Sequence, residues 1–136
     1  MIRFYFESTK EFPLKKLEIK NWLNKVIINE NYESGDLNII FCSDVYLIEI
    51  NKKYLSHDYY TDIITFNYCE DKIISGDVYI STDRINENTS IYSTSFQNEL
   101  NRVMVHGILH LLKYNDKTEE EKKEMTSKEN QYLNIL

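Results

Sequence analysis

Two of the three histidines in the 136-residue chain, His106 and His110, lie four residues apart in the segment VHGILHLLKYND, and Asp116 follows six residues later. Side chains at positions i and i+4 share one face of an α-helix, so these imidazoles can bind one metal ion. A turn after the helix can bring Asp116 back to the same ion. The spacing therefore predicts a centre of two imidazoles and one carboxylate, with a position left open for water.

This ligand set is typical of a catalytic ion, because structural zinc sites usually close with four ligands and often use cysteine. Spacing alone leaves open the alternative that these residues bind no metal, with both histidines as ordinary core or surface residues and Asp116 as a solvated loop residue. Cys42 and Cys69 have no CxxC partner, and we expect reduced, packed thiols of a cytosolic protein.

The residue after His106 is Gly107, where zinc proteases of the HExxH type carry the glutamate that serves as general base. Glycine cannot take a proton, so peptide hydrolysis by that mechanism is disfavoured. Phosphodiester hydrolysis depends more on the ion, which acidifies a bound water and polarises a phosphoryl oxygen. The nucleophile can be this metal-bound water or the 2′-OH of RNA, and the sequence leaves both open.

Hydrophobic patterning predicts the elements that must position these residues. A long helix over residues 95–112 carries both histidines, and Leu100, Val103, Met104 and Leu111 give it an apolar face toward a sheet. We expect strands at 1–7, 37–42, 63–68 and 76–82, with the last two paired as a hairpin, and further helices at 13–28, 45–55 (capped by Asp44), 83–88 and 118–133. The predicted fold class is α+β, a small mixed four-stranded sheet with helices packed on it.

Length and composition favour one domain over residues 1–136. No stretch approaches the ~20 apolar residues of a membrane span, and the first residues do not resemble a signal peptide, so we expect a cytoplasmic protein without a membrane partner. The net charge of −6 argues against nucleic acid as a partner, although a local basic patch stays compatible with that total.

The segment HGILHLLKYND resembles the signature of the YbeY family, bacterial rRNA maturation factors regarded as zinc-dependent endoribonucleases. YTDIITFNY, SGDVYIS, NELNRVMVHG and INKKYL are similar to further family segments, and together these pieces span roughly residues 36–133 in the family's order. The resemblance implies one zinc ion held by His106, His110 and Asp116.

The same resemblance implies cleavage of single-stranded rRNA in 16S rRNA 3′-end maturation and ribosome biogenesis. It also implies the small ribosomal subunit as a partner and allows a ribosome-assembly GTPase as a second one. DNA is not an expected partner. We expect substrate contacts from Tyr59, Tyr60, Thr61 and Arg84, because tyrosines can stack on unpaired bases and basic groups can bind phosphate.

Three positions depart from the family pattern. Asp116 stands where histidine is usual, and a carboxylate is a competent zinc ligand. Lys113 stands where glycine is usual, at a helix end whose left-handed conformation costs lysine about 1 kcal/mol. Leu55 replaces an arginine thought to assist the active site, and Arg84, His57 and Lys53 are the candidates to substitute for it.

Two other functions compete with the nuclease. A ribosome-assembly binding factor whose metal is structural, with little or no nuclease activity, fits the charge of −6 and the missing arginine. A non-haem Fe(II) oxygenase also uses two histidines and a carboxylate, but such triads are typically carried on strands, which a helical HxxxH pair contradicts.

Overall fold

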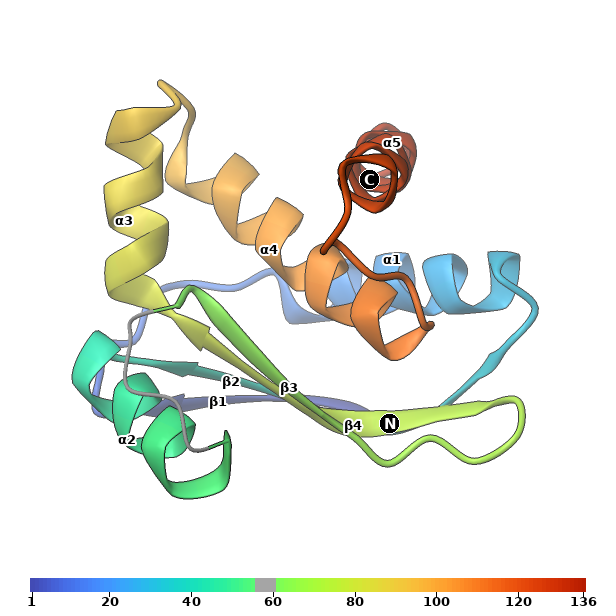
Figure 1. The fold of residues 1–136 in the computed structure, drawn as a ribbon, viewed down its shortest axis with the longest axis horizontal. Helices are drawn as coiled ribbons and strands as arrows, with labels where there is room; N and C mark the ends of the chain where they lie inside the picture. Colours follow the sequence, from blue (N-terminus) through green and yellow to red (C-terminus); the bar gives the residue numbers. More distant parts are fainter. Residues whose placement is uncertain (56–60) are drawn as a thin grey trace.

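The fold of the computed structural model, which describes residues 1–55 and 61–136, is a four-stranded mixed sheet with five helices (Figure 1). The strands lie in the order β1-β2-β4-β3; β1, β2 and β4 run parallel, and β3 pairs antiparallel with β4. The predicted α+β class and the predicted hairpin are confirmed. The bounds are β1 Ile2–Glu7, α1 Lys16–Asn29, β2 Glu33–Cys42, α2 Asp44–Leu55, β3 Ile63–Asn67, β4 Ile73–Ser81, α3 Thr82–Ile91, α4 Phe96–Leu111 and α5 Glu119–Leu133.

The two faces of the sheet carry different helices (Figure 1). On one face, alternate strand residues such as Val78 and Ile80 join the main core with α1, α4 and α5, and α4 lies directly over β3 and β4. On the other face, Tyr79 packs with Tyr46 of α2 in a smaller cluster. The long helix α4 thus lies between the sheet and α5, and its polar flank is available to form a functional site.

The apolar face of α4 is buried as predicted. Leu100, Val103, Met104 and Leu111 are all at most 4% exposed. The predicted capping box of α5 is present, because the Thr118 hydroxyl accepts from the Glu121 N–H while the Glu121 carboxylate accepts from the Thr118 N–H.

Some details of the predicted elements are wrong. Ser43, not Asp44, caps α2, since its hydroxyl oxygen accepts a hydrogen bond from the Tyr46 N–H at 3.1 Å. Asp44 instead receives hydrogen bonds from Ser81 and Arg84. Helix α1 begins at Lys16, three residues after Pro13, which therefore lies outside the first turn.

The residues from Ser56 to Tyr60, which include the predicted helpers and substrate contacts His57, Tyr59 and Tyr60, lie outside the described residues, as does the side chain of Leu55. No helix within the described ranges combines the length and the apolar character that crossing a bilayer requires. Cys42 is buried and Cys69 is half-buried, and both are free thiols, as expected.

Candidate metal centre

Helix α4 presents His106 and His110 from its polar flank, one turn apart, with ring centroids 4.5 Å apart. Gly107, between them, faces β3 and β4 at close range. A Cβ atom at this position would lie 2.7 Å from Val78 Cγ1 and 2.9 Å from Ile63 Cδ1. Glycine therefore allows the helix to seat close against β3 and β4, which fixes the height of both imidazoles above the sheet.

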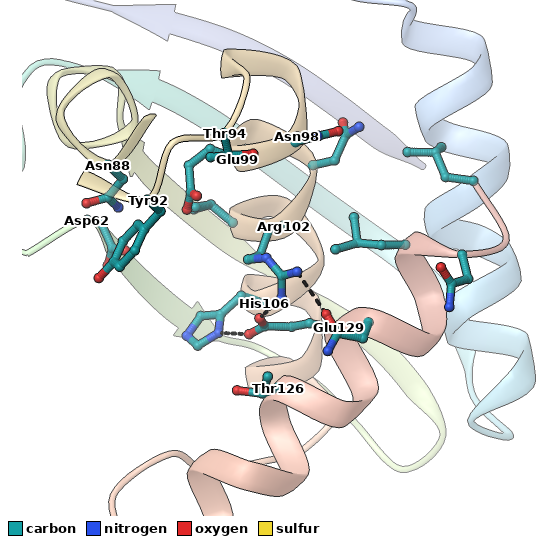
Figure 2. A pocket seen from close by; sticks show the side chains of 16 residues that line it. Asp62, Asn88, Tyr92, Thr94, Asn98, Glu99, Arg102, His106, Thr126 and Glu129 are labelled. Carbon is teal, nitrogen blue, oxygen red and sulfur yellow. Dashed lines mark hydrogen bonds and ion pairs between the residues drawn. The ribbon is translucent and has the colours of Figure 1, made fainter. Parts of the chain in front are cut away.

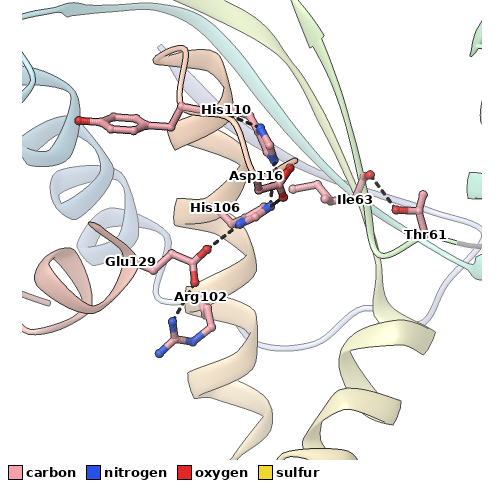
Figure 3. A network of polar contacts seen from close by, with 8 residues as sticks. Thr61, Ile63, Arg102, His106, His110, Asp116 and Glu129 are labelled. Atoms are coloured by element: carbon pink, nitrogen blue, oxygen red, sulfur yellow. Dashed lines mark hydrogen bonds and ion pairs between the residues drawn. The ribbon is translucent and has the colours of Figure 1, made fainter. Parts of the chain in front are cut away.

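The chain turns back after α4 and delivers Asp116 to the histidines. Lys113 has a φ of 77°, the left-handed conformation predicted for this helix end, and its N–H donates to the His110 carbonyl at 3.0 Å. The Asp116 Oδ2 atom then lies 3.3 Å from His106 Nε2 and 3.5 Å from His110 Nε2. The three donor atoms fall within 4.8 Å of one another, as the sequence predicted (Figure 3).

The outer nitrogen of each imidazole has its own partner, which sets the ring orientation. His110 Nδ1 lies 3.1 Å from the Tyr114 carbonyl, which can only accept, so this nitrogen carries the proton. His106 Nδ1 lies 2.6 Å from Glu129 Oε2, a carboxylate oxygen that also accepts. Both neutral rings therefore turn an Nε2 lone pair inward, as metal-binding histidines do.

This donor set fits a divalent cation. The two Nε2 atoms are 2.9 Å apart, so their inward lone pairs repel unless a proton or a cation lies between them. The carboxylate of Asp116 adds negative charge at the same point. Imidazole nitrogens with a carboxylate oxygen are ligands that zinc accepts, and a set of three protein ligands is typical of a catalytic ion.

The two imidazoles differ in basicity. Burial lowers the pKa of His106, but its hydrogen bond to Glu129 and the charges of Glu129 and Asp116 outweigh this, and the net pKa lies above the ordinary value. Burial and the neighbouring His106 hold the pKa of His110 below its ordinary value. A proton in the metal-free centre therefore resides on His106, where Glu129 stabilises the positive charge.

The sequence prediction missed Glu129 and Arg102. Glu129 is 6% exposed and comes from α5, where it holds His106 with one carboxylate oxygen and Arg102 with the other at 2.8 Å (Figure 3). The available signal was its position, since Glu129 shares the buried face of α5 with Met125 and Tyr132. A carboxylate on an apolar helix face requires a partner, and the sequence alone did not identify that partner.

A second carboxylate supports the loop that carries Asp116. Glu30, at the end of α1, accepts hydrogen bonds from the hydroxyls of Tyr114 and Tyr132, and Lys128 pairs with it at 3.4 Å. The Tyr114 carbonyl is the group that holds His110 Nδ1. Glu30 thus ties α1, α5 and the loop after α4 together beside the centre.

The other predicted site residues lie in different surroundings. The Arg84 guanidinium pairs with Asp44 at 3.1 Å and with Glu87 at 3.1 Å, at the start of α3. The Thr61 hydroxyl donates to the Ile63 carbonyl at 3.3 Å. Lys53 belongs to α2, which covers the sheet face opposite to α4, and its ammonium lies 5.3 Å from the Tyr54 ring centre (Figure 1).

Fold and site together define an α+β protein whose long helix bears a centre of two imidazoles and a carboxylate able to hold a metal ion. The family model described as Endoribonuclease YbeY matches residues 5–136. Relatives named Endoribonuclease YbeY include those of Cytophaga hutchinsonii, 45% identical over 97% of this chain and 94% of the relative, and of Amoebophilus asiaticus, 47% identical over 96% and 90%.

A solved structure gives the same result. The solution structure of TM1509 from Thermotoga maritima is 30% identical and superposes with a TM-score of 0.68, covering 97% of this chain and 86% of that one. The chain belongs to the Endoribonuclease YbeY family. The predicted family is confirmed, and the predicted class of activity agrees with the name that its relatives carry, a hydrolase of RNA phosphodiester bonds.

Proposed function

We propose that residues 1–136 form one domain that acts as a zinc-dependent endoribonuclease on single-stranded rRNA, in 16S rRNA 3′-end maturation and ribosome biogenesis in the cytoplasm. The small ribosomal subunit is its proposed partner, with a ribosome-assembly GTPase as a further one. The observation that carries the proposal is the convergence of His106, His110 and Asp116 within 4.8 Å in a member of this family.

The chain's own residues have distinct tasks in this function. His106, His110 and Asp116 would hold one zinc ion, while Glu129 and the Tyr114 carbonyl fix the imidazoles in the metal-binding tautomer. A bound zinc ion supplies Lewis acidity toward a phosphoryl oxygen and lowers the pKa of a water to about 7. Arg102 neutralises the charge of Glu129, so a centre that holds zinc, with Asp116 as its one charged ligand, would keep a net positive charge that attracts phosphate.

The substrate contacts are part of the proposal. Tyr59 and Tyr60 would stack on unpaired bases, with Thr61 beside them. Arg84 would reach phosphate only by giving up part of its pairing with Asp44 and Glu87. His57 and Lys53 are the other candidates to replace the arginine that the family usually carries at the position of Leu55.

Cleavage of an end-labelled single-stranded RNA by zinc-loaded protein tests the proposal. The matched control is the His110→Ala variant purified in the same way, with zinc content measured on both by elemental analysis. We expect cutting by the wild type only, together with one zinc per wild-type chain. Equal cutting by both proteins would identify a contaminating nuclease, and a zinc-loaded wild type that never cuts would contradict the nuclease.

The latter result would favour the second candidate, a ribosome-assembly binding factor with a structural metal. The net charge of −6 and the engagement of Arg84 by two carboxylates support it. It predicts that zinc removal lowers the melting temperature while RNA stays intact under every metal condition. A substrate with one 2′-deoxy nucleotide at the cut separates the two cleavage modes, since only attack by the 2′-OH requires that group.

A further inference from the structure

A groove lined mostly by polar residues leads away from the metal centre along the flank of α4, between α3 and α5. Its volume is about 950 Å³, and its walls include Tyr92 of the segment after α3, Glu99 and Arg102 of α4, and His106 at one end (Figure 2). Nucleotide-sized ligands bind in pockets of this size. His106 belongs both to the groove and to the centre, so the groove adjoins the centre at this residue.

The charges in the groove are unsuited to phosphate. Arg102 is engaged by Glu129 at 2.8 Å and by the Asn130 amide oxygen at 2.8 Å. Asp62 and Glu99 add two carboxyl groups to the walls. The phosphate of a nucleotide would therefore lie at the metal, and the groove would receive an uncharged part of the molecule.

The polar groups that face the groove match the edge of a nucleobase. Glu99 is only 8% exposed and lines the groove together with Asn88. A ligand that donates N–H groups to this carboxyl would replace the water that burial has removed. Tyr92, 67% exposed at the rim, offers a ring on which a base can stack.

We propose that this groove binds the base of the nucleotide next to the scissile phosphate and that Glu99 gives it a preference for guanine. The inference rests on the proposed nuclease function. Guanine presents two adjacent donors, N1–H and the 2-amino group, which match the two oxygens of a carboxylate. Uracil presents one N–H between two carbonyl oxygens, and these would be repelled by the same carboxylate.

Calorimetric titration of the zinc-loaded protein with nucleoside monophosphates tests this preference, because these ligands contain no bond for the enzyme to cut. Guanosine, inosine and uridine monophosphates are compared, each with a 3′- and a 5′-phosphate. We expect guanosine monophosphate to bind about tenfold more tightly than uridine monophosphate. Inosine monophosphate, which lacks the 2-amino group, should fall between them.

Two variants assign the effect to the groove. Glu99→Gln keeps the shape but replaces one acceptor oxygen with a donor, so guanosine monophosphate should bind less tightly, uridine monophosphate should bind as tightly as before or more tightly, and the preference for guanine should fall below about threefold. Tyr92→Leu changes a residue that is 67% exposed, and it should weaken the binding of both nucleotides by a similar factor. Glu120→Gln, on the exposed first turn of α5, is the matched control and should leave both affinities unchanged.

Equal or absent binding of the two nucleotides by the wild type would overturn the inference, as would a guanine preference that survives Glu99→Gln. If Glu99→Gln does not fold, unchanged affinities in Tyr92→Leu would overturn it. Cleavage of labelled RNA by the same wild-type sample is scored separately. Cleavage of RNA together with equal binding of the nucleotides would reject only the proposal that the groove prefers guanine. Preferential binding of guanosine monophosphate without cleavage would reject only the proposed nuclease function.

Discussion

His106 Nδ1 and Glu129 Oε2 lie 2.6 Å apart although the two residues are 23 positions apart in the chain. The contact joins α4 to α5 and turns the Nε2 atom of His106 toward Asp116. Arg102 holds the other oxygen of Glu129, so the carboxylate cannot rotate away without breaking an ion pair. The orientation of a proposed metal ligand is thus determined by a helix that contributes no ligand itself.

Glu129→Gln should lower the affinity for zinc by about 10–100-fold, because a carboxamide has the same size but is a weaker acceptor for the imidazole N–H. Competition with a chromophoric chelator at pH 7.5 measures the affinity. Glu124→Gln, also on α5 but exposed, serves as control. An affinity within about twofold of the wild type would show that Glu129 does not orient His106.

Asp116→Ala should abolish retention of zinc, because two imidazoles alone leave the ion with only two protein ligands. Elemental analysis after gel filtration measures the zinc content, and circular dichroism checks that the fold persists. Lys117→Ala, on the neighbouring exposed residue, is the control. One zinc per chain in Asp116→Ala would exclude Asp116 as the third ligand.

Gly107→Ala should lower the free energy of unfolding, because the new methyl group would lie 2.7 Å from Val78 Cγ1. Overpacking of this kind costs about 1–3 kcal/mol, and the better helix propensity of alanine offsets up to about 1 kcal/mol. Urea denaturation gives the net effect. Combining the change with Val78→Ala makes room for the methyl group, so the double variant should be more stable than the sum of the single changes predicts. Strict additivity would contradict the proposed close approach.

Glu30→Gln should make the free energy of unfolding decrease less steeply as the pH becomes acidic. Burial raises the pKa of Glu30, but hydrogen bonds from Tyr114 and Tyr132 and the charge of Lys128 outweigh it, and the pKa lies below its ordinary value of 4.5. A carboxyl with a lowered pKa in the folded state contributes stability above pH 4.5, and this contribution is lost as the pH falls through the folded-state pKa.

The stability difference between wild type and Glu30→Gln, measured by urea denaturation from pH 3 to 7, should therefore shrink on the acidic side. A difference that stays constant over this range would show that the Glu30 carboxylate is not held by the two tyrosines. The pKa of Tyr132 is raised to about 12 by burial and by Glu30, so this tyrosine stays neutral and able to donate throughout the experiment.

Local patterns predicted most of the elements. Thr118 and Glu121 marked the start of α5, and the apolar positions of α4 marked its buried face, since both signals depend on neighbours within one helix. The start of β2 was missed because Ser34, Gly35 and Asp36 suggest a turn. In the structure Gly35 lies inside the strand, where a Cβ would meet Ser75 Oγ at 2.2 Å, so glycine serves a close approach of two strands.

The sequence predicted only the part of the site that lies on α4 and in the turn that follows it. The spacing of His106 and His110 and the left-handed Lys113 are local features, and they gave the convergence with Asp116. Glu129 and Glu30 reach the centre through the tertiary packing of α5 and α1. A single sequence does not show which residues of these helices lie next to α4. The pairing of Arg84 with Asp44 joins residues 40 positions apart and was equally beyond local patterns.

The place of α5 in the chain has a consequence in time. Glu129 follows His106 by 23 positions, and His106 is not oriented until α5 has docked on α4. During synthesis His106 therefore emerges before the carboxylate that orients it. A nascent chain that has exposed α4 but not yet α5 lacks this contact, and the centre is completed only when α5 has docked.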